Sequence, residues 1–180
     1  MTAQLPKAYA WLEHEPAPRL LKEALKTFGT QEAKGSADNP TILWWAKSIG
    51  LKASYRHDAV PWCGLTVAYW AAQAGWPHAP RGNALWARNW LAWEDAAPVP
   101  MLGDVLVFAR GSSGHVGIYA GEDRDAFHVL GGNQGDRVSI KRIARSRLLG
   151  ARRCHWNINQ PANVRAVQMT ARGPLSANEA

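Results

Sequence analysis

A cysteine and a histidine in this sequence could together cleave an amide bond. Cys63 stands at the start of an apolar stretch that Pro61 opens and that Gly75 and Trp76-Pro77 end, which is the pattern of a helix. The start of a helix carries a partial positive charge and free N–H groups, which favour a thiolate and can receive a developing oxyanion. Cys63 is therefore a candidate nucleophile, although a small buried core cysteine is the commoner interpretation of such a position.

His115 is the candidate base. It opens an expected strand directly after the turn at residues 111–114, where it can face the end of a helix packed on the sheet. A cysteine nucleophile needs a group that accepts its proton and later protonates the leaving amine. A third group should hold the imidazole in the right tautomer. Two residues further along could do so: Asn133 through its amide oxygen, and His128 through a ring nitrogen.

The elements that must position these residues change in character halfway along the chain. Helical spacing of apolar residues, after a loose lead-in, predicts helices over residues 19–28, 41–48 and 61–74, and a short one over 84–93. Short runs rich in β-branched and aromatic residues predict strands over 104–109, 115–120, 126–130, 137–140 and 148–154. Helices followed by a meander of about five strands predict an α+β fold, with the helices on one face of an antiparallel sheet.

One globular domain accounts for the 180 residues, of which 47% are hydrophobic and 19% charged. We expect residues 1–39 to form an N-terminal lead-in and a first helix packed on the core, and residues 40–156 to form the catalytic domain. Residues 157–180 contain prolines and few large apolar side chains, which predicts a peripheral and partly disordered tail. Two cysteines are too few for a disulfide framework, and we expect Cys63 and Cys154 to stay unpaired.

Aromatic side chains near the nucleophile are candidates for contacts with a sugar ring. Trp86, Trp90 and Trp93 follow one another at spacings of four and three residues, which favours packing between elements over a sugar-binding groove. Trp62 and Trp86 are the candidate substrate-binding residues.

The net charge of +7 favours anionic partners, among them an anionic cell-wall polymer. No basic run or nucleic-acid motif occurs, so a nucleic-acid partner is not expected. A denser basic group is interpreted as a solvated face; it contains Lys141, Arg142, Arg145, Arg147, Arg152 and Arg153. The cysteines and histidines lack the clustering that structural zinc needs, so we expect neither a metal nor another cofactor.

No secretory signal is recognisable over residues 1–21, because acidic residues interrupt the apolar stretch that such a signal requires. No stretch reaches the roughly 18 to 20 apolar residues of a transmembrane helix. We therefore expect synthesis in the cytoplasm, with no insertion into a membrane.

Four short motifs, in this order along the chain, resemble those of papain-like cell-wall hydrolases: the NlpC-type peptidases and the cysteine, histidine-dependent amidohydrolase/peptidase (CHAP) domains. Pro-Trp-Cys-Gly at 61–64 resembles their nucleophile motif, and residues 103–108 resemble the strand before their histidine. Gly-His-Val-Gly-Ile-Tyr at 114–119 resembles the histidine motif itself. Leu-Gly-Gly-Asn-Gln at 130–134 resembles the third motif of a phage- and prophage-associated branch, which Asn39-Pro40 also fits.

The resemblance implies a papain-like fold and hydrolysis of an amide bond in peptidoglycan through an acyl-enzyme on Cys63. His115 would protonate the departing amine and then activate water, and Asn133 would orient His115. NlpC-type members often carry a histidine about a dozen positions after the catalytic one. His128 fits that spacing and is the alternative third residue, but the Gly-Gly-Asn-Gln context favours Asn133.

The expected function is therefore a peptidoglycan amidase or endopeptidase, which acts as a phage endolysin or an exported cell-wall toxin. As a monomer, it would reach the wall, in the periplasm or outside the cell, through a holin or a secretion system. The alternative is a catalytically silent wall-binding or phage structural module with the same fold. The sequence leaves open which amide bond is cut and which route of delivery is used.

Overall fold

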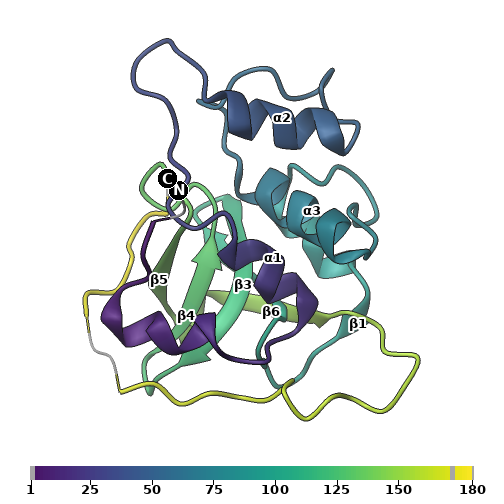
Figure 1. Ribbon diagram of the computed structural model, residues 1–180, viewed down its shortest axis with the longest axis vertical. Coiled ribbons are helices and arrows are strands. Elements are labelled where there is room, and N and C mark those ends of the chain that lie inside the picture. The colour runs from purple at the N-terminus through teal and green to yellow at the C-terminus, as the bar shows by residue number, and fades with distance from the viewer. Residues whose placement is uncertain (1–2, 171–172, 180) are drawn as a thin grey trace.

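Helices and one antiparallel sheet make up the computed structural model, which describes residues 3–170 and 173–179 (Figure 1). The α-helices are α1 (Arg19–Leu25), α2 (Pro40–Ser48) and α3 (Cys63–Ala74), and the 3₁₀ helices are η1 (Lys7–Glu13), η2 (Ala87–Ala92) and η3 (Arg145–Arg147). The strands are β1 (Asp95–Ala96), β2 (Val105–Arg110), β3 (Ser113–Glu122), β4 (Ala126–Gly131), β5 (Ser139–Ala144) and β6 (Leu148–Arg153). The predicted α+β class and antiparallel sheet are confirmed.

The strands are arranged in the order β1-β6-β2-β3-β4-β5, and every neighbouring pair is antiparallel. Strands β2 to β5 form the expected meander. The chain then returns through η3, and β6 pairs with β2 at the other side of the meander. Strand β3, which carries His115, therefore lies inside the sheet with a partner on each side.

Helix α3 begins and ends where the sequence predicts. Trp62 is its N-cap residue, directly after Pro61, and Gly75 ends it with a φ of 81°, a left-handed conformation that glycine adopts without steric strain. Helices α1 and α3 pack on each other and on β3 and β4, while α2 packs on α3 and lies away from the sheet (Figure 1).

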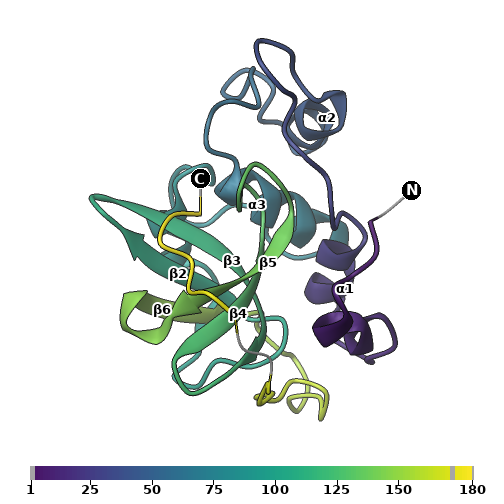
Figure 2. The ribbon, with the colours of Figure 1, turned by 90° about the vertical axis from the view of Figure 1, so that its left-hand side faces the viewer.

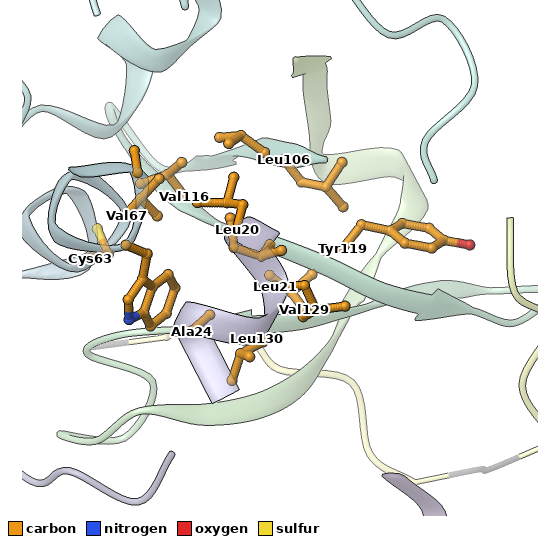
Figure 3. Close-up of a cluster of buried hydrophobic side chains, with 14 of the residues drawn as sticks. Leu20, Leu21, Ala24, Cys63, Val67, Leu106, Val116, Tyr119, Val129 and Leu130 are labelled. Carbon is orange, nitrogen blue, oxygen red and sulfur yellow. The ribbon is translucent and has the colours of Figure 1, made fainter. Parts of the chain in front are cut away.

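Apolar side chains hold the start of α3 against the sheet. In Figure 3, Cys63 and Val67 of α3 lie beside Val116 of β3, and Leu20 and Leu21 of α1 extend the same cluster. Each of these side chains is buried. The nucleophile candidate is therefore positioned by the core itself and not by a surface loop.

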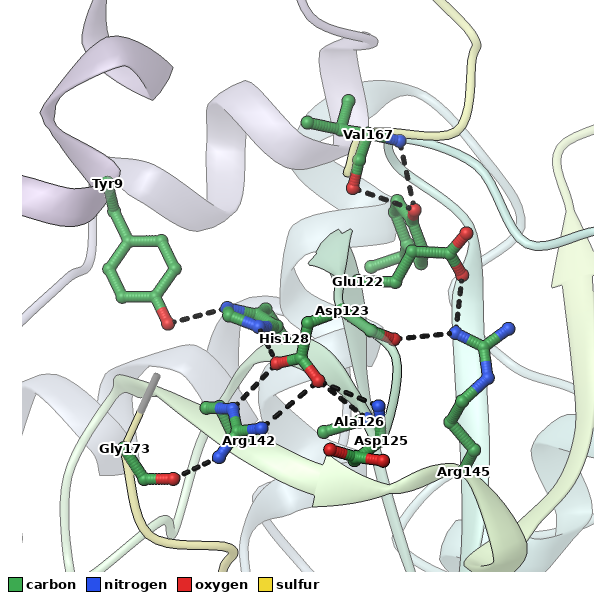
Figure 4. Close-up of polar contacts among 11 residues, drawn as sticks. Tyr9, Glu122, Asp123, Asp125, Ala126, His128, Arg142, Arg145, Val167 and Gly173 are labelled. Carbon is green, nitrogen blue, oxygen red and sulfur yellow. Dashed lines mark hydrogen bonds and ion pairs between the residues drawn. The ribbon is translucent and has the colours of Figure 1, made fainter. Parts of the chain in front are cut away.

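The N-terminal lead-in is tied to the sheet, whereas the sequence predicted a loose segment. Tyr9 and Leu12 of η1 are buried in the core. The Tyr9 hydroxyl lies 2.8 Å from Nδ1 of His128, whose Nε2 lies 2.7 Å from a carboxylate oxygen of Asp123 (Figure 4). Arg142 pairs with the same carboxylate and, as the largest cause, holds the pKa of Asp123 below its usual range. This partly buried polar network joins η1 to the β3–β4 hairpin and to β5.

The last described residues of the C-terminal tail lie on the sheet, where a peripheral and partly disordered tail was expected, whereas residues 157–160 are exposed and peripheral. The Ser176 N–H donates to Arg142 O of β5 over 2.8 Å, and Figure 2 shows this segment running along the same part of the sheet. Glu179 is buried, and its carboxylate accepts two hydrogen bonds of 2.8 and 2.7 Å from Arg147. Its carbonyl oxygen accepts from the Gly135 N–H.

The dense basic group forms ion pairs, which corrects its interpretation as a solvated face. Four of its arginines pair with carboxylates: Arg142 with Asp123, Arg145 with Glu122, Arg147 with Glu179, and Arg153 with Asp104. A fifth, Arg152, donates to the backbone oxygens of Trp93 and Glu94. Within the described part of the chain, no helix is both long and apolar enough to span a membrane.

Candidate functional site

Cys63 is the first residue of α3 and lines a cleft of about 630 Å³. Only 3% of the residue is exposed. Its sulfur accepts a hydrogen bond from the backbone N–H of Val116, the residue that follows His115 in β3. Glycine at position 64 lets the backbone of Ala84 and Leu85 pack closely against the start of α3, because a Cβ at Gly64 would lie 2.4 Å from Ala84 O. The fold therefore brings the thiol to the beginning of the strand that carries the histidine.

Burial governs the ionisation of this thiol. It raises the pKa of Cys63, and this effect outweighs the Val116 N–H, the Arg110 charge and the N–H groups at the helix start, all of which lower it. The contribution of the helix start, on which the sequence argument relied, is thus present but smaller than desolvation. At neutral pH the resting group is a thiol.

His115 is fully buried, and Gln134 fixes its tautomer. The Nε2 atom of the ring lies 3.0 Å from Gln134 Oε1. The amide nitrogen of Gln134 donates to Val129 O and Ser139 O, over 3.1 and 2.5 Å, so the orientation of the amide follows from its hydrogen bonds. Oε1 is thus the acceptor, Nε2 carries the hydrogen, and Nδ1 keeps its lone pair. Nδ1 is buried, and the described part of the chain provides it with no hydrogen-bond partner.

The imidazole is neutral at physiological pH. Burial lowers the pKa of His115 to about 4, and the charges of Arg110 and Arg147 act in the same direction, against Glu179 and Gln134, which raise it. The resting pair is therefore a thiol and a neutral imidazole. An unprotonated Nδ1 can accept a proton, so His115 is in the state that a general base requires.

The hydrogen bond that we expected from Asn133 comes instead from the next residue, Gln134. Asn133 has a φ of 56°, a left-handed conformation that asparagine adopts more readily than most residues with a side chain. Its side chain makes no hydrogen bond within the described residues. The left-handed backbone of the turn therefore accounts for an asparagine at position 133. Gln134 is the amide that orients His115. Gln134 is the last residue of the motif at 130–134, so the sequence did contain a signal that could have identified it.

His128, the alternative third residue, lies too far away to orient His115. It pairs with Gly121, six residues along β3 from His115. At about 3.3 Å per residue this corresponds to roughly 20 Å. Both of its ring nitrogens are engaged, by Tyr9 and Asp123. The spacing in sequence was suitable, but the strand register carries His128 to the other end of the hairpin.

The two tryptophans proposed for substrate binding have different environments. Trp86 is 69% exposed and lines the cleft together with Cys63. Trp62 is fully buried, its ring lies against Trp45, and its indole N–H donates to Glu32 over 3.0 Å. Trp62 is therefore a core residue, which corrects its assignment as a substrate contact. Trp90 and Trp93 are buried, as the packing interpretation of the three tryptophans predicted, but the exposure of Trp86 shows that this interpretation was wrong for Trp86.

Comparisons with known proteins add no relative: no family model matches the chain, and a search of the curated proteins finds no match. The structure is an α+β protein in which a buried thiol at a helix start lines a cleft, and an imidazole oriented by an amide is carried by the strand packed against that helix. Any function must therefore be argued from this geometry.

Replacing Gly132 by alanine should disturb the site through the backbone. A Cβ at this position would lie 2.1 Å from Thr66 Oγ1 and 2.9 Å from Trp62 Cε3, so α3 and the loop that carries Gln134 would have to separate. We expect a loss of about 1–3 kcal/mol in the free energy of unfolding, the usual effect of overpacking. Urea unfolding would measure it. Gly173→Ala is the matched control, because no atom of the described residues lies within 4 Å of a Cβ there. Equal midpoints for Gly132→Ala and wild type would contradict the expectation.

Proposed function

We propose that the protein is a papain-like cysteine amidase or endopeptidase that hydrolyses an amide bond of peptidoglycan. The observation that carries the proposal is the tautomer of His115, whose Nε2–H is held by Gln134 while Nδ1 remains an unoccupied base. This base belongs to the residue next to Val116, whose N–H reaches the Cys63 sulfur. A core cysteine or a core histidine without a catalytic role would not require that arrangement.

The reaction begins with a proton transfer. As the Cys63 sulfur attacks the carbonyl carbon of the scissile amide, its proton moves to Nδ1 of His115. The negative charge that develops on the carbonyl oxygen can be received by the backbone N–H of Cys63 at the start of α3. Because both groups are neutral at rest, the ion pair of thiolate and imidazolium need exist only during the attack.

Two bond cleavages complete the cycle. The tetrahedral intermediate collapses, the C–N bond breaks, and the imidazolium gives its proton to the departing amine, which leaves a thioester on Cys63. Water then loses a proton to Nδ1 and attacks the thioester. The products are a free carboxylic acid and the regenerated thiol, and Gln134 keeps the ring in the same tautomer throughout.

Peptidoglycan is the substrate that best fits the remaining features. The net charge of +7 suits an anionic wall. The exposed Trp86 offers the cleft a flat aromatic face beside Cys63. The resemblance of four ordered motifs to NlpC-type and CHAP domains supports the same substrate. The protein would act at the wall as a monomeric endolysin or as an exported toxin, delivered by a holin or a secretion system.

A second candidate function is a silent wall-binding or phage structural module. The observation that favours it is the closure of the site, in which Cys63 is 3% exposed and His115 not at all. Such a module would use the Trp86 side of the cleft to bind the wall and would cut nothing.

Digestion of purified peptidoglycan separates the two candidates. Wild-type protein is incubated with walls of several chemotypes, and the soluble fragments are analysed by mass spectrometry. The enzyme proposal predicts fragments with a new amine and a new carboxyl end at one bond, either next to the lactyl group of the sugar or within the peptide. Sedimentation of the protein with the walls, without any released fragment, would instead support the binding module.

Gln134→Leu should slow the reaction while leaving substrate binding nearly intact. Leucine keeps the approximate volume but removes the acceptor of the His115 Nε2–H, so the productive tautomer is no longer enforced. We expect kcat to fall about 100-fold, within the range attributed to positioned general bases, with little change in KM. Asn133→Gly is the matched control, since glycine retains the left-handed backbone. If Asn133→Gly lost activity and Gln134→Leu did not, the assignment of the orienting residue would be wrong.

A further inference from the structure

Arg110 is the arginine of the Cys63 cleft that lacks a matching acceptor. It ends β2 at the tight turn into β3, opposite Ser113. Its Nη1 is buried and has no hydrogen-bond partner among the described residues. Its Nε makes only a long contact of 3.5 Å, to the Ser113 hydroxyl. Buried polar atoms in proteins are normally paired, so an orphaned guanidinium nitrogen indicates a partner absent from the resting chain.

The rest of the cleft supplies no anion to fill that role. Its other arginine, Arg88, is engaged by the backbone, since it donates to Ser113 O over 2.8 Å and to Gly111 O over 3.2 Å. No aspartate or glutamate is among the described residues that line the cleft. By contrast, four arginines between residues 142 and 153 each have a carboxylate as an ion-pair partner.

The missing partner must be an acceptor and is best an anion. A guanidinium has only donors and stays charged at any pH at which proteins fold. Its planar fork matches the two oxygens of a carboxylate, and such charge-assisted pairs are about twice as strong as neutral hydrogen bonds. The charge of Arg110 also acts on both reacting groups, since it lowers the pKa of Cys63 and that of His115. An anion at Arg110 would therefore lie close to the site of reaction.

We propose that Arg110 binds a free carboxylate of the substrate peptide and so selects stem peptides whose carboxylate beside the scissile amide is not amidated. The proposal rests on the proposed function, because it takes the occupant of the cleft to be a peptidoglycan stem. Trp86 lines the same cleft and offers an apolar surface to another part of the substrate. Arg110 is thus a specificity-determining residue and not a participant in the proton transfers.

Calorimetric titration of the Cys63→Ala protein tests this directly, because the variant can bind substrate without cutting it. The two ligands are a synthetic muropeptide with free carboxylates and the same muropeptide with these groups amidated. We expect the free form to bind about 10- to 100-fold more tightly, the range that a hydrogen bond to a charged group provides. Arg110→Gln in the same background should remove this preference, and Arg110→Lys should keep part of it, since lysine retains the charge without the fork.

The matched control is Arg124→Gln, which removes the same charge from an exposed position in the β3–β4 hairpin and should keep the full preference. Equal binding of the two muropeptides to Cys63→Ala, binding of neither, or an undiminished preference in Arg110→Gln would each overturn the proposal. Turnover of both muropeptides by wild type is followed in parallel. A binding preference without any turnover would support the carboxylate site and reject the enzyme. Equal turnover with equal binding would reject the carboxylate site and retain the enzyme.

Discussion

Cys63→Ala is expected to release no detectable fragments from peptidoglycan, with a loss in rate of at least about 10⁴-fold. In the proposed mechanism the change removes the atom that forms the thioester, and nucleophile replacements in hydrolases have effects of this size or larger. The fold should survive, because alanine is compatible with the helix and fills most of the space of a cysteine. Fragment release measured by mass spectrometry gives the rate, and circular dichroism with urea unfolding confirms that the variant is folded.

Cys154→Ala provides the matched control for this prediction. Cys154 is the other free cysteine, also buried, and its pKa is raised to about 12, chiefly by burial. It follows β6 and does not line the cleft. We expect Cys154→Ala to retain wild-type activity. A loss of activity in Cys154→Ala as large as that in Cys63→Ala, with both variants folded, would show that Cys63 has no special role.

His115→Ala should be nearly as damaging, with a fall in kcat of about 10³-fold or more. Without the imidazole no group takes the proton of a thiol whose pKa is raised by burial, and none protonates the leaving amine. Substrate binding should change little, because the ring is fully buried behind the cleft surface. Steady-state kinetics on a soluble muropeptide would measure kcat and KM separately.

His128→Gln distinguishes the two histidines. Here we expect near-normal activity of the folded protein but a lower free energy of unfolding, since Tyr9 and Asp123 lose a buried partner of matching shape. The assignment of the base to His115 would be refuted if His128→Gln abolished turnover at a temperature where it is folded, while His115→Ala remained active.

Features determined by neighbouring residues could be predicted from the sequence. Pro61 before Cys63 and Gly75 after Ala74 specify the ends of α3, and short runs rich in β-branched and aromatic residues specify the strands of the meander. Contacts between distant segments could not be predicted in the same way. Tyr9 and His128 form a hydrogen bond although they are 119 residues apart in sequence, and Arg147 and Glu179 do so at a separation of 32. The packing of the lead-in and of the tail on the sheet depends on such contacts, which only the folded chain reveals.

The residue that orients His115 was predictable to within one position. The motif at 130–134 indicated that an amide would meet His115, but the choice between Asn133 and Gln134 depends on the backbone of the turn. With a φ of 56° at Asn133, the chain directs the following side chain to the ring. His128 was a plausible alternative for as long as the strand register was unknown. Trp62 was misassigned because a residue next to a candidate nucleophile in sequence can still belong to the core.

The burial of the Cys63 thiol should slow its oxidation when the protein is outside the reducing interior of a cell. Oxidation of a cysteine to sulfenic acid and beyond requires thiolate character and access for the oxidant. Cys63 offers little of either at rest, because burial both raises its pKa and leaves only 3% of the residue exposed. If the protein acts at a bacterial wall, as proposed, peroxide and disulfide-forming oxidants there would therefore meet a protonated and buried sulfur. In the proposed mechanism, the same burial that makes a base necessary would protect the thiol from oxidation until a substrate binds.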